Sequence, residues 1–151
     1  MAMTKEVKDA MSASVLCWLA TANSKGDPNV SPKEMFLPGE GNIFLIANIA
    51  SPQSVQNIRE NAAVCICFID IFRQKGYQLK GIARVVERND EAFEDHFERF
   101  QPLVTDRYPV LSIIEIEVTS AKPVIAPSYT LFPDTTEDDQ IDQALVSYGL
   151  K

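Results

Sequence analysis

Apolar positions in the first third of the chain form strand-length runs separated by clusters of turn-forming residues. The runs are Val15–Ala22, Asn29–Leu37 and Asn42–Ile49, and the intervening segments Asn23–Pro28 and Pro38–Asn42 are rich in Gly, Pro, Asn and Asp. Strands joined by such short polar connections pair as antiparallel neighbours. The pattern therefore predicts a three-stranded antiparallel meander.

The next segment changes from strand to helical spacing and back. Ser51 suits a helix N-cap and Pro52 suits the first helical position, and the predicted helix ends near Asn61. Two further strands are predicted at Ala62–Phe72 and Tyr77–Arg88.

Two more helices and one strand are predicted from periodicity and capping residues. A helix is expected after Asn89 and Asp90, and Leu111–Thr119 alternates as a half-exposed strand. A short N-terminal helix is expected at Thr4–Ala13 with Thr4 as its N-cap. The apolar face of the helix after Asp90 consists of Phe93, Phe97, Phe100 and Val104.

The C-terminal part has a different pattern. Lys122–Pro133 carries three prolines, so an extended segment is expected, including Ala126–Pro133. A last helix is expected to begin at Thr135 or Thr136, where acidic residues suit the positive end of the helix dipole. Its expected apolar stripe is Ile141, Leu145 and Tyr148.

Six mostly consecutive strands with inserted helices predict a mainly β fold with peripheral helices, arranged as a small antiparallel barrel. The length of 151 residues predicts a single domain, 1–151. The strands Ile43–Ile49 and Ala62–Phe72 are apolar on both faces. A small barrel hides one face only, so a helix or a second subunit must cover the other, and we expect a dimer.

Composition and charge narrow the function classes. With 21 acidic and 14 basic residues the net charge is −7, which argues against a general binder of nucleic acids or anionic membranes. No apolar run reaches membrane-helix length, and the charged N-terminus predicts no signal peptide. The three cysteines show no metal or disulfide spacing, so we expect buried thiols and a cytoplasmic protein.

Most catalytic motifs are missing from the sequence. A single histidine, His96, allows no histidine pair and no His-rich metal site, and we interpret it as a surface residue beside Asp95 and Arg99. There is no P-loop, no Gly-x-Ser-x-Gly and no Gly-x-Gly-x-x-Gly sequence.

Two segments remain as candidate sites. At Asn48–Ser54 a strand runs directly into a helix, where free first-turn amides and the hydroxyls of Ser51 and Ser54 can bind phosphate. The alternative is that Ser51 is a helix cap and nothing more. The second segment is Val30–Phe36, in which Pro32 favours an edge strand, a bulge or an interrupted strand. Backbone groups near Lys33 and Glu34 would then be free to bind a ligand. The alternative is an exposed edge with an ordinary Lys–Glu pair.

Several blocks of the sequence, in order and spacing, resemble the pyridoxamine 5′-phosphate oxidase-like family. The blocks are Leu19–Ala22, Gly26–Lys33, Ile43–Asn48, Asn57–Asn61 and Leu79–Ala83, within a region from Val15 to Val86. The resemblance implies a six-stranded antiparallel split β-barrel and a homodimer with two FMN sites at the subunit interface.

The resemblance also implies positions for the FMN-binding residues. The isoalloxazine ring falls on Ser31, Lys33, Glu34, Met35, Ala47 and Asn48, and the phosphate falls on Ser51, Gln53 and Ser54. Family members often carry a basic residue in the phosphate segment where this chain has Gln53 and Ser54. The nearest basic residues are Lys33, Arg59 and Lys80, so either one of them reaches the phosphate or neutral donors bind it.

The resemblance leaves the activity open. We expect a flavin-dependent oxidoreductase with NAD(P)H as the candidate electron donor, and the alternatives are a non-catalytic flavin-binding or flavin-storage protein and a structural barrel with an empty pocket. No match to the substrate-phosphate residues of the true oxidases is present, which argues against vitamin B6 synthesis. Tyr129 and Phe132 either fix the tail to its own barrel or cross to the partner subunit and cover a flavin ring.

Overall fold

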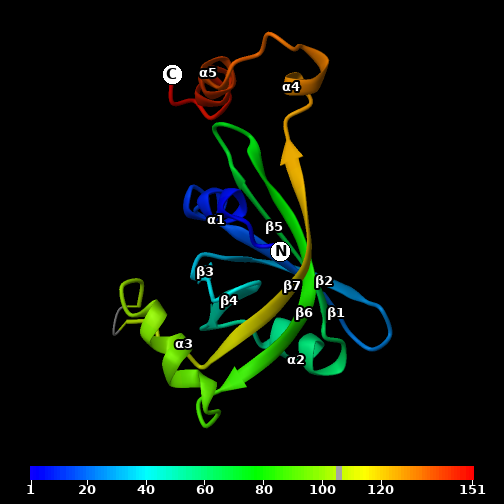
Figure 1. Cartoon of the computed structure of the whole chain (residues 1–151), viewed down its shortest axis with the longest axis vertical. Coiled ribbons are helices and arrows are strands. Elements are labelled where there is room, and N and C mark those ends of the chain that lie inside the picture. The colour runs from blue at the N-terminus through cyan, green and yellow to red at the C-terminus, as the bar shows by residue number, and fades with distance from the viewer. Residues whose placement is uncertain (105–106) are drawn as a thin grey trace.

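The computed structural model describes residues 1–104 and 107–151. Within this part of the chain, seven strands form one antiparallel sheet in the order β2-β1-β5-β6-β7-β4-β3 (Figure 1). The strands are β1 (Cys17–Ala22), β2 (Pro28–Lys33), β3 (Phe36–Pro38), β4 (Ile43–Asn48), β5 (Ala63–Asp70), β6 (Lys75–Glu87) and β7 (Ser112–Ile125). The helices are α1 (Lys5–Ser12), α2 (Pro52–Glu60), α3 (Ala92–Phe100), α4 (Ser128–Leu131) and α5 (Glu137–Ser147). The predicted mainly β fold with peripheral helices is confirmed, with seven strands instead of six.

The additional strand arises because the predicted strand Asn29–Leu37 is interrupted at Glu34 and Met35. β2 pairs with β1 at one edge of the sheet, whereas β3 pairs with β4 at the opposite edge. Two residues span only about 10 Å even when extended, so the two edges must lie close together. The interruption therefore curls the sheet into a barrel. Pro32 itself lies in the edge strand β2, so of the predicted alternatives the edge position is observed at Pro32 and the interruption follows two residues later.

The barrel interior is filled by side chains that alternate along the strands. Phe44, Phe68, Leu19 and Ile66 are among the fully buried residues, and the Phe44 ring stacks between Phe36 and Phe68. α1 adds Val7 and Met11 to this cluster, Met3 joins it from the segment before α1, and α2 adds Val55 and Ile58. Both helices therefore pack against the barrel on their apolar sides, as their sequence periodicity predicts.

α3 covers the second apolar face of β4. Leu45 and Ala47 pack with Phe93 and Phe100 in a second buried cluster that also contains Ile113 of β7. Of the two covers that the sequence analysis offered for the second face of Ile43–Ile49, a helix or a second subunit, the structure shows the helix for this strand. The outer face of β5 is different, since Cys65, Cys67 and Ile69 stay only half-buried.

The C-terminal segment differs from the predicted extended tail. β7 continues to Ile125 by pairing with β6 from Lys75 onward, so Lys122 and Pro123 lie in a strand. Pro123 is tolerated because β4 pairs with β7 only up to Glu117, so the missing N–H faces no neighbouring strand.

Beyond β7, Ser128–Leu131 forms the short helix α4, and the expectation of an extended Ala126–Pro133 is wrong. The helical backbone of Pro127 begins this turn, because a proline is already in a conformation suited to a helix start.

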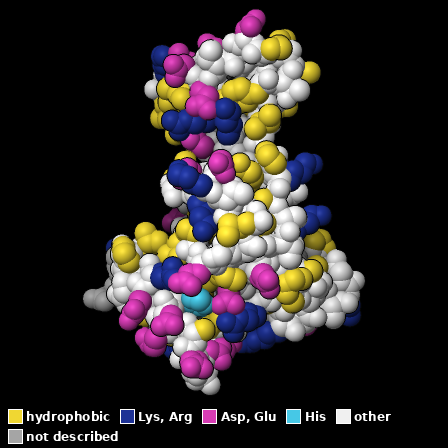
Figure 2. Space-filling model, in the orientation of Figure 1, with side chains coloured by type: hydrophobic (Ala, Val, Ile, Leu, Met, Phe, Trp, Pro, Cys, Tyr) yellow, Lys and Arg dark blue, Asp and Glu magenta, His cyan; other side chains and the backbone are white. Residues whose placement is uncertain are grey.

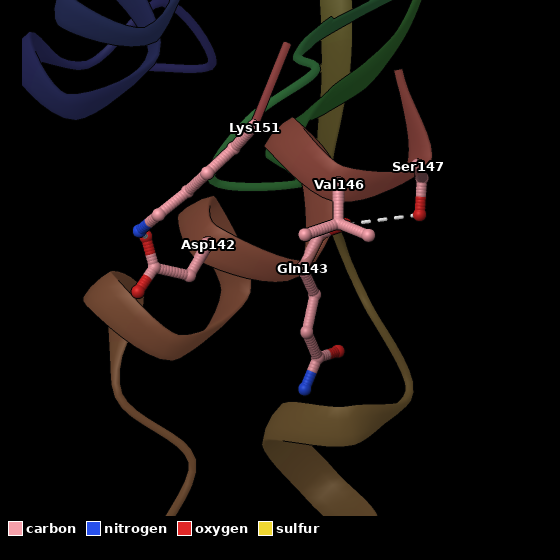
Figure 3. A pocket seen from close by; sticks show the side chains of 5 residues that line it. All are labelled: Asp142, Gln143, Val146, Ser147 and Lys151. Carbon is pink, nitrogen blue, oxygen red and sulfur yellow. Dashed lines mark hydrogen bonds and ion pairs between the residues drawn. The ribbon is translucent and has the colours of Figure 1, made fainter. Parts of the chain in front are cut away.

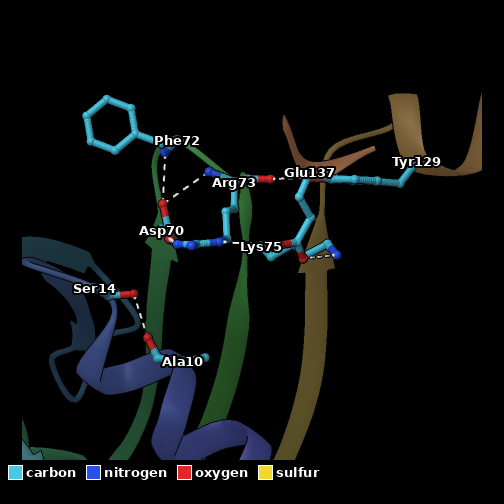
Figure 4. Close-up of polar contacts among 8 residues, drawn as sticks. All are labelled: Ala10, Ser14, Asp70, Phe72, Arg73, Lys75, Tyr129 and Glu137. Atoms are coloured by element: carbon cyan, nitrogen blue, oxygen red, sulfur yellow. Dashed lines mark hydrogen bonds and ion pairs between the residues drawn. The ribbon is translucent and has the colours of Figure 1, made fainter. Parts of the chain in front are cut away.

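α4 and α5 lie beyond the tip of the β5–β6 hairpin and are held there by ionic contacts (Figure 4). Glu137 Oε1 lies 2.6 Å from Lys75 Nζ, and Glu137 Oε2 lies 3.4 Å from Arg73 Nε. The Tyr129 hydroxyl donates to the Arg73 carbonyl at 2.8 Å, and Asp70 pairs with Arg73 at 2.6 Å. These contacts attach the C-terminal segment to its own barrel.

The predicted start of the last helix is confirmed by a capping box between Thr136 and Asp139. Its predicted apolar stripe is only partly buried. Tyr148 meets the edge of the Phe72 ring but stays exposed, and the buried positions are Gln140 and Ala144. The helix is therefore docked more by polar contacts than by apolar burial.

The sequence predicted His96 as a surface residue beside Asp95 and Arg99, but its hydrogen-bond partner in the structure is Glu115. Its Nε2 lies 2.5 Å from Glu115 Oε2, and Glu115 also accepts from Arg84 Nε at 2.6 Å, which links α3 to β6 and β7. Arg99 instead pairs with Glu40 at 2.8 Å. The acidic side chains of α3 contribute to the magenta cluster at the lower left of Figure 2. His96 is thus half-buried in a polar contact between the helix and the sheet.

We expect Glu115→Gln to lower the free energy of unfolding by about 1 kcal/mol at pH 7. Burial raises the pKa of Glu115, but hydrogen bonds from Arg84 and His96 outweigh it and hold this pKa below its ordinary value. The stabilisation is therefore present above the ordinary pKa and is lost as the pH falls through the lower native pKa. Urea unfolding at pH 7 and pH 3 measures this, with exposed Glu117→Gln as the matched control. An equal loss at both pH values would contradict the ionic contribution.

Candidate functional site

Part of the predicted ligand site lies around one pocket of the described chain. The pocket has a volume of about 290 Å³ and lies between the β2–β3 junction and the segment that joins β4 to α2. It is lined by Pro32, Lys33, Glu34, Met35, Ala47, Ile49, Ala50, Ser51 and Tyr108. Five of the predicted site residues line it directly: Lys33, Glu34, Met35, Ala47 and Ser51.

The junction between β2 and β3 positions one wall of the pocket. The Met35 carbonyl accepts from the Ala47 N–H at 2.9 Å, which connects this junction to β4 although neither residue of the Glu34–Met35 pair is in a strand. Glu34 is exposed, Met35 is half-buried and Lys33 is buried. Of these three side chains, that of Lys33 is therefore the one directed into the protein.

Asn48 holds the opposite wall in place. Its Oδ1 accepts from the Ser51 N–H at 3.0 Å, and its Nδ2 donates to Ser112 Oγ at 2.9 Å. Both polar groups of this buried side chain are thus used to fix the turn before α2. A direct contact of Asn48 with a flavin remains a prediction.

Ser51 occupies the N-cap position of α2 but its side chain makes no capping hydrogen bond. By comparison, Thr4 and Thr136 both accept a first-turn N–H with their side chains at the starts of α1 and α5. The first-turn N–H groups of α2 have no side-chain cap, and they carry the partial positive charge of the helix dipole. The alternative that Ser51 serves as a helix cap and nothing more therefore loses support.

Lys33 is the most informative residue of the site. It is only 7% exposed, and its Nζ donates to Ser31 Oγ at 2.5 Å, while Ser31 Oγ lies 3.3 Å from Ser54 Oγ in α2. None of the ion pairs among the described residues includes Lys33. Burial lowers the pKa of Lys33, as expected for an ammonium group withdrawn from water.

A buried cation without a carboxylate partner is costly, and a bound anion is what would compensate it. The group beside Lys33 consists of two hydroxyls, of Ser31 and Ser54, and the start of a helix, all of which donate to anions. This donor set fits a phosphate monoester. Of the three basic candidates, Lys33 of β2 approaches the start of α2 through Ser31 and Ser54.

The other two basic candidates lie elsewhere. Arg59 forms an ion pair with Glu87 near the C-terminal end of α2, and Lys80 is exposed on β6 opposite Cys65. Lys80 does not line the pocket within one chain, so its contact with a cofactor remains a prediction that requires a second subunit. Gln53 is exposed on the first turn of α2, next to the buried Ser54.

Tyr129 and Phe132 lie in the C-terminal segment and do not line this pocket. The Tyr129 ring lies 4.6 Å below Lys75 Nζ in its own chain, whereas Phe132 is 65% exposed. A contact of either ring with the cofactor of a partner subunit stays a prediction. Tyr108 was not predicted, because it lies in the loop after α3, where no periodicity indicates the direction of a side chain.

Another hollow is larger but lacks the chemistry of a site. It has a volume of about 530 Å³ on the surface of α5 and is lined by Asp142, Gln143, Val146, Ser147 and Lys151 (Figure 3). Lys151 pairs with Asp142 at 2.6 Å, and the Ser147 hydroxyl donates to the carbonyl of Gln143. Its charged groups are thus already partnered, and one helix with the chain end forms all of it.

Metal sites and membrane-spanning helices are absent from the described part of the chain. Residues 1–104 and 107–151 contain no group of three or more His, Cys, Asp or Glu side chains arranged to hold a metal ion. None of the described helices has both the length and the apolar composition needed to cross a membrane.

A curled antiparallel barrel with a pocket at a helix start is thus the class that fold and site define. The family described as Pyridoxamine 5'-phosphate oxidase matches residues 3–130, and the chain belongs to this family. No curated protein matches the chain in sequence.

Solved structures share this fold. HupZ from Group A Streptococcus is similar at 26% identity and a TM-score of 0.65, over 78% of this chain and 90% of that one. An FMN-binding protein from Syntrophomonas wolfei subsp. wolfei is similar at 12% identity and a TM-score of 0.68, over 81% and 86%. HutZ, the heme storage protein from Vibrio cholerae, is similar at 22% identity and a TM-score of 0.55, over 83% and 95%. At these identities the last two show the fold alone.

Proposed function

We propose that this protein binds FMN in the pocket between the β2–β3 junction and α2, and that the bound flavin serves an oxidoreductase reaction. The observation that carries the proposal is the buried Lys33 ammonium, which lacks a carboxylate partner and lies beside Ser31, Ser54 and the start of α2. Membership of the pyridoxamine 5′-phosphate oxidase family and the fold shared with an FMN-binding protein support FMN as the phosphate-bearing ligand.

The rest of the pocket suits a planar aromatic ring. Met35, Ala47 and Ile49 supply apolar contact, and the exposed Tyr108 ring lies at the pocket. Ligand pockets of this kind combine an apolar lining with a few placed polar groups. The flavin would supply hydride or electron transfer, while the chain binds the phosphate, orients the ring and excludes water. This division explains why no acid–base pair is needed among the pocket residues.

We further propose a homodimer formed through the outer face of β2, β1, β5 and β6. Trp18 is 47% exposed, Val30 is 60% exposed and Ile82 is 53% exposed on this face, although all three are large and apolar. Cys65 and Cys67 lie between them, since Ala20 pairs with both Val30 and Cys65, and Trp18 pairs with Cys67. Exposed apolar surface of this extent on a small protein marks an interaction site.

The proposed dimer would also complete the pocket. Pro32 lines the pocket and pairs with Trp18 on the outer face, so the two features share a border. The pocket volume of about 290 Å³ is just below the range for ligand sites, roughly 300–1,000 Å³. A second subunit placed over this face would add the missing wall.

The absorption spectrum of the purified protein tests the cofactor. We expect the two visible bands of oxidised flavin, and release by acid should yield FMN. A heme Soret band would instead favour the ligand named for HutZ, and a colourless protein that binds no added flavin would contradict the proposal.

Addition of NAD(P)H to the flavin-loaded protein separates the enzyme from the alternative, a flavin-binding or flavin-storage protein. Bleaching of the flavin bands faster than with free FMN supports an oxidoreductase. FMN binding without such bleaching by NAD(P)H supports the storage alternative. The three free thiols favour a reducing compartment, so we place the protein in the cytoplasm.

A further inference from the structure

A chain of buried polar side chains fastens α2 to the barrel one turn behind the proposed phosphate site. Asn57 is 1% exposed, and its Nδ2 donates to Thr21 Oγ1 of β1 at 3.0 Å. Its Oδ1 accepts from Gln53 Nε2 at 2.8 Å. Thr21 is itself only 4% exposed, so this contact lies inside the protein and not on its surface.

Packing alone does not require an amide at this position. α2 already contributes Val55 and Ile58 to the core, and an apolar side chain at 57 would add to that cluster without any polar group to satisfy. Apolar contacts are non-directional and leave a short helix free to slide or rotate slightly. The hydrogen bond from Asn57 to Thr21 fixes the helix at one height and one rotation on β1.

The same bonds act on the residues of the first turn. Gln53 lies four residues and Ser54 three residues before Asn57, so all three lie on one face of α2. Asn57 orients the Gln53 amide directly. The link to Thr21 also holds α2 where Ser54 Oγ can approach Ser31 Oγ, and through it the Lys33 ammonium.

We propose that Asn57 and Thr21 are positioning residues that determine affinity for the phosphate group of the ligand. They hold the Gln53 amide, the Ser54 hydroxyl and the first-turn N–H groups of α2 around one anion together with Lys33. The assignment of that anion as the FMN phosphate rests on the proposed function. The positioning itself rests on the hydrogen bonds of Asn57 and the burial of both side chains.

The test compares FMN with riboflavin, which has the same ring but no phosphate. Thr21→Val keeps the shape of the side chain and removes the hydroxyl, and Thr21→Ser keeps the hydroxyl as the matched control. We expect Thr21→Val and Asn57→Leu to raise the dissociation constant of FMN about tenfold and that of riboflavin less than twofold, by fluorescence titration. Thr21→Ser should keep the wild-type ratio of the two constants.

Equal losses for both ligands, or an unchanged FMN affinity in Thr21→Val, would overturn the proposal and leave Asn57 with a role in stability only. A second readout needs no flavin. Inorganic phosphate, compared with chloride at equal ionic strength, should raise the melting temperature of wild type more than that of Thr21→Val. If wild type binds no flavin but shows this difference, the FMN assignment fails and the positioning role stands. If all variants respond equally to phosphate while FMN binds normally, the positioning role fails alone.

Discussion

Lys33→Met is expected to lower the affinity for FMN by roughly 10- to 100-fold while changing the affinity for riboflavin little. The buried ammonium is the one cation beside the hydroxyls of Ser31 and Ser54 among the described residues, and methionine fills a similar volume without charge. Hydrogen bonds to a charged group contribute about 1.5–3 kcal/mol, and 1.4 kcal/mol corresponds to a factor of ten. Fluorescence titration with the two ligands measures the ratio.

The same substitution should stabilise the protein without ligand. Lys33 is buried without a carboxylate, so its charge costs free energy in the native state until an anion binds. Chemical unfolding of the ligand-free protein should show a higher free energy of unfolding for Lys33→Met than for wild type. Lys25→Met, in the exposed β1–β2 turn, is the control and should change neither quantity. An unchanged ratio of FMN to riboflavin affinity in Lys33→Met would place the phosphate elsewhere.

The pH dependence of the ligand-free protein follows from the direction of the Lys33 shift. Burial lowers its native pKa below the ordinary value of 10.5, so between these two values the unfolded chain binds more protons than the native one. The contribution of Lys33 to stability therefore rises with pH in that window. This rise in stability with pH should be missing in Lys33→Met. It should shrink when phosphate or FMN is bound, because an anion stabilises the charged form of Lys33.

Trp18→Asp combined with Ile82→Asp is expected to convert a dimer into a monomer of 16.8 kDa. Both side chains are about half exposed on the outer face of the sheet, so a monomer loses little packing when they are replaced. In a dimer that buries on the order of 2,000 Å² the same changes place charges in an apolar interface. Light scattering at micromolar concentration measures the mass, and FMN affinity should fall with dissociation.

Leu103→Asp provides the matched control for this pair. Leu103 is 52% exposed in the loop after α3, outside the four strands whose outer face forms the proposed interface. This variant should stay dimeric. A wild-type protein that is already monomeric, or a double variant that stays dimeric, would contradict the proposed interface.

The parts of the fold that the sequence predicted are those governed by local rules. Turn residues separated the strands, Thr4 and Thr136 marked the starts of α1 and α5, and Pro32 indicated an edge strand close to the interruption between β2 and β3. Each of these depends on a few neighbouring residues. The pairing of β2 and β3 at opposite edges of the sheet depends on the whole topology, so the seventh strand could not be counted from periodicity.

The features of the fold that the sequence did not predict have a common physical cause, which is contact between segments distant in sequence. β7 extends through Pro123 because β6 offers a partner on one side and β4 has already ended on the other. The second face of β4 is covered by α3, which no local pattern indicates. His96 contacts Glu115, nineteen residues later, and not its neighbours in the helix.

In the candidate site, too, local features were predicted from the sequence and long-range contacts were not. Its segments were predicted because a strand that enters a helix, and a proline in a strand, are visible in sequence. The spatial relation of Lys33 to Ser54 was not, because only the curled sheet and α2 bring the two together. The roles of Asn57 and Thr21 were hidden for the same reason, since they lie 36 residues apart.

A crystal structure of the protein grown with FMN would show directly where the cofactor binds. We predict the phosphate within hydrogen-bond distance of Lys33 Nζ and the first-turn N–H groups of α2, with the ring over Met35 and Ala47 and a second subunit closing the pocket beside Pro32. FMN bound with its phosphate away from Lys33 and α2, or a pocket that stays open in a monomer, would contradict this prediction.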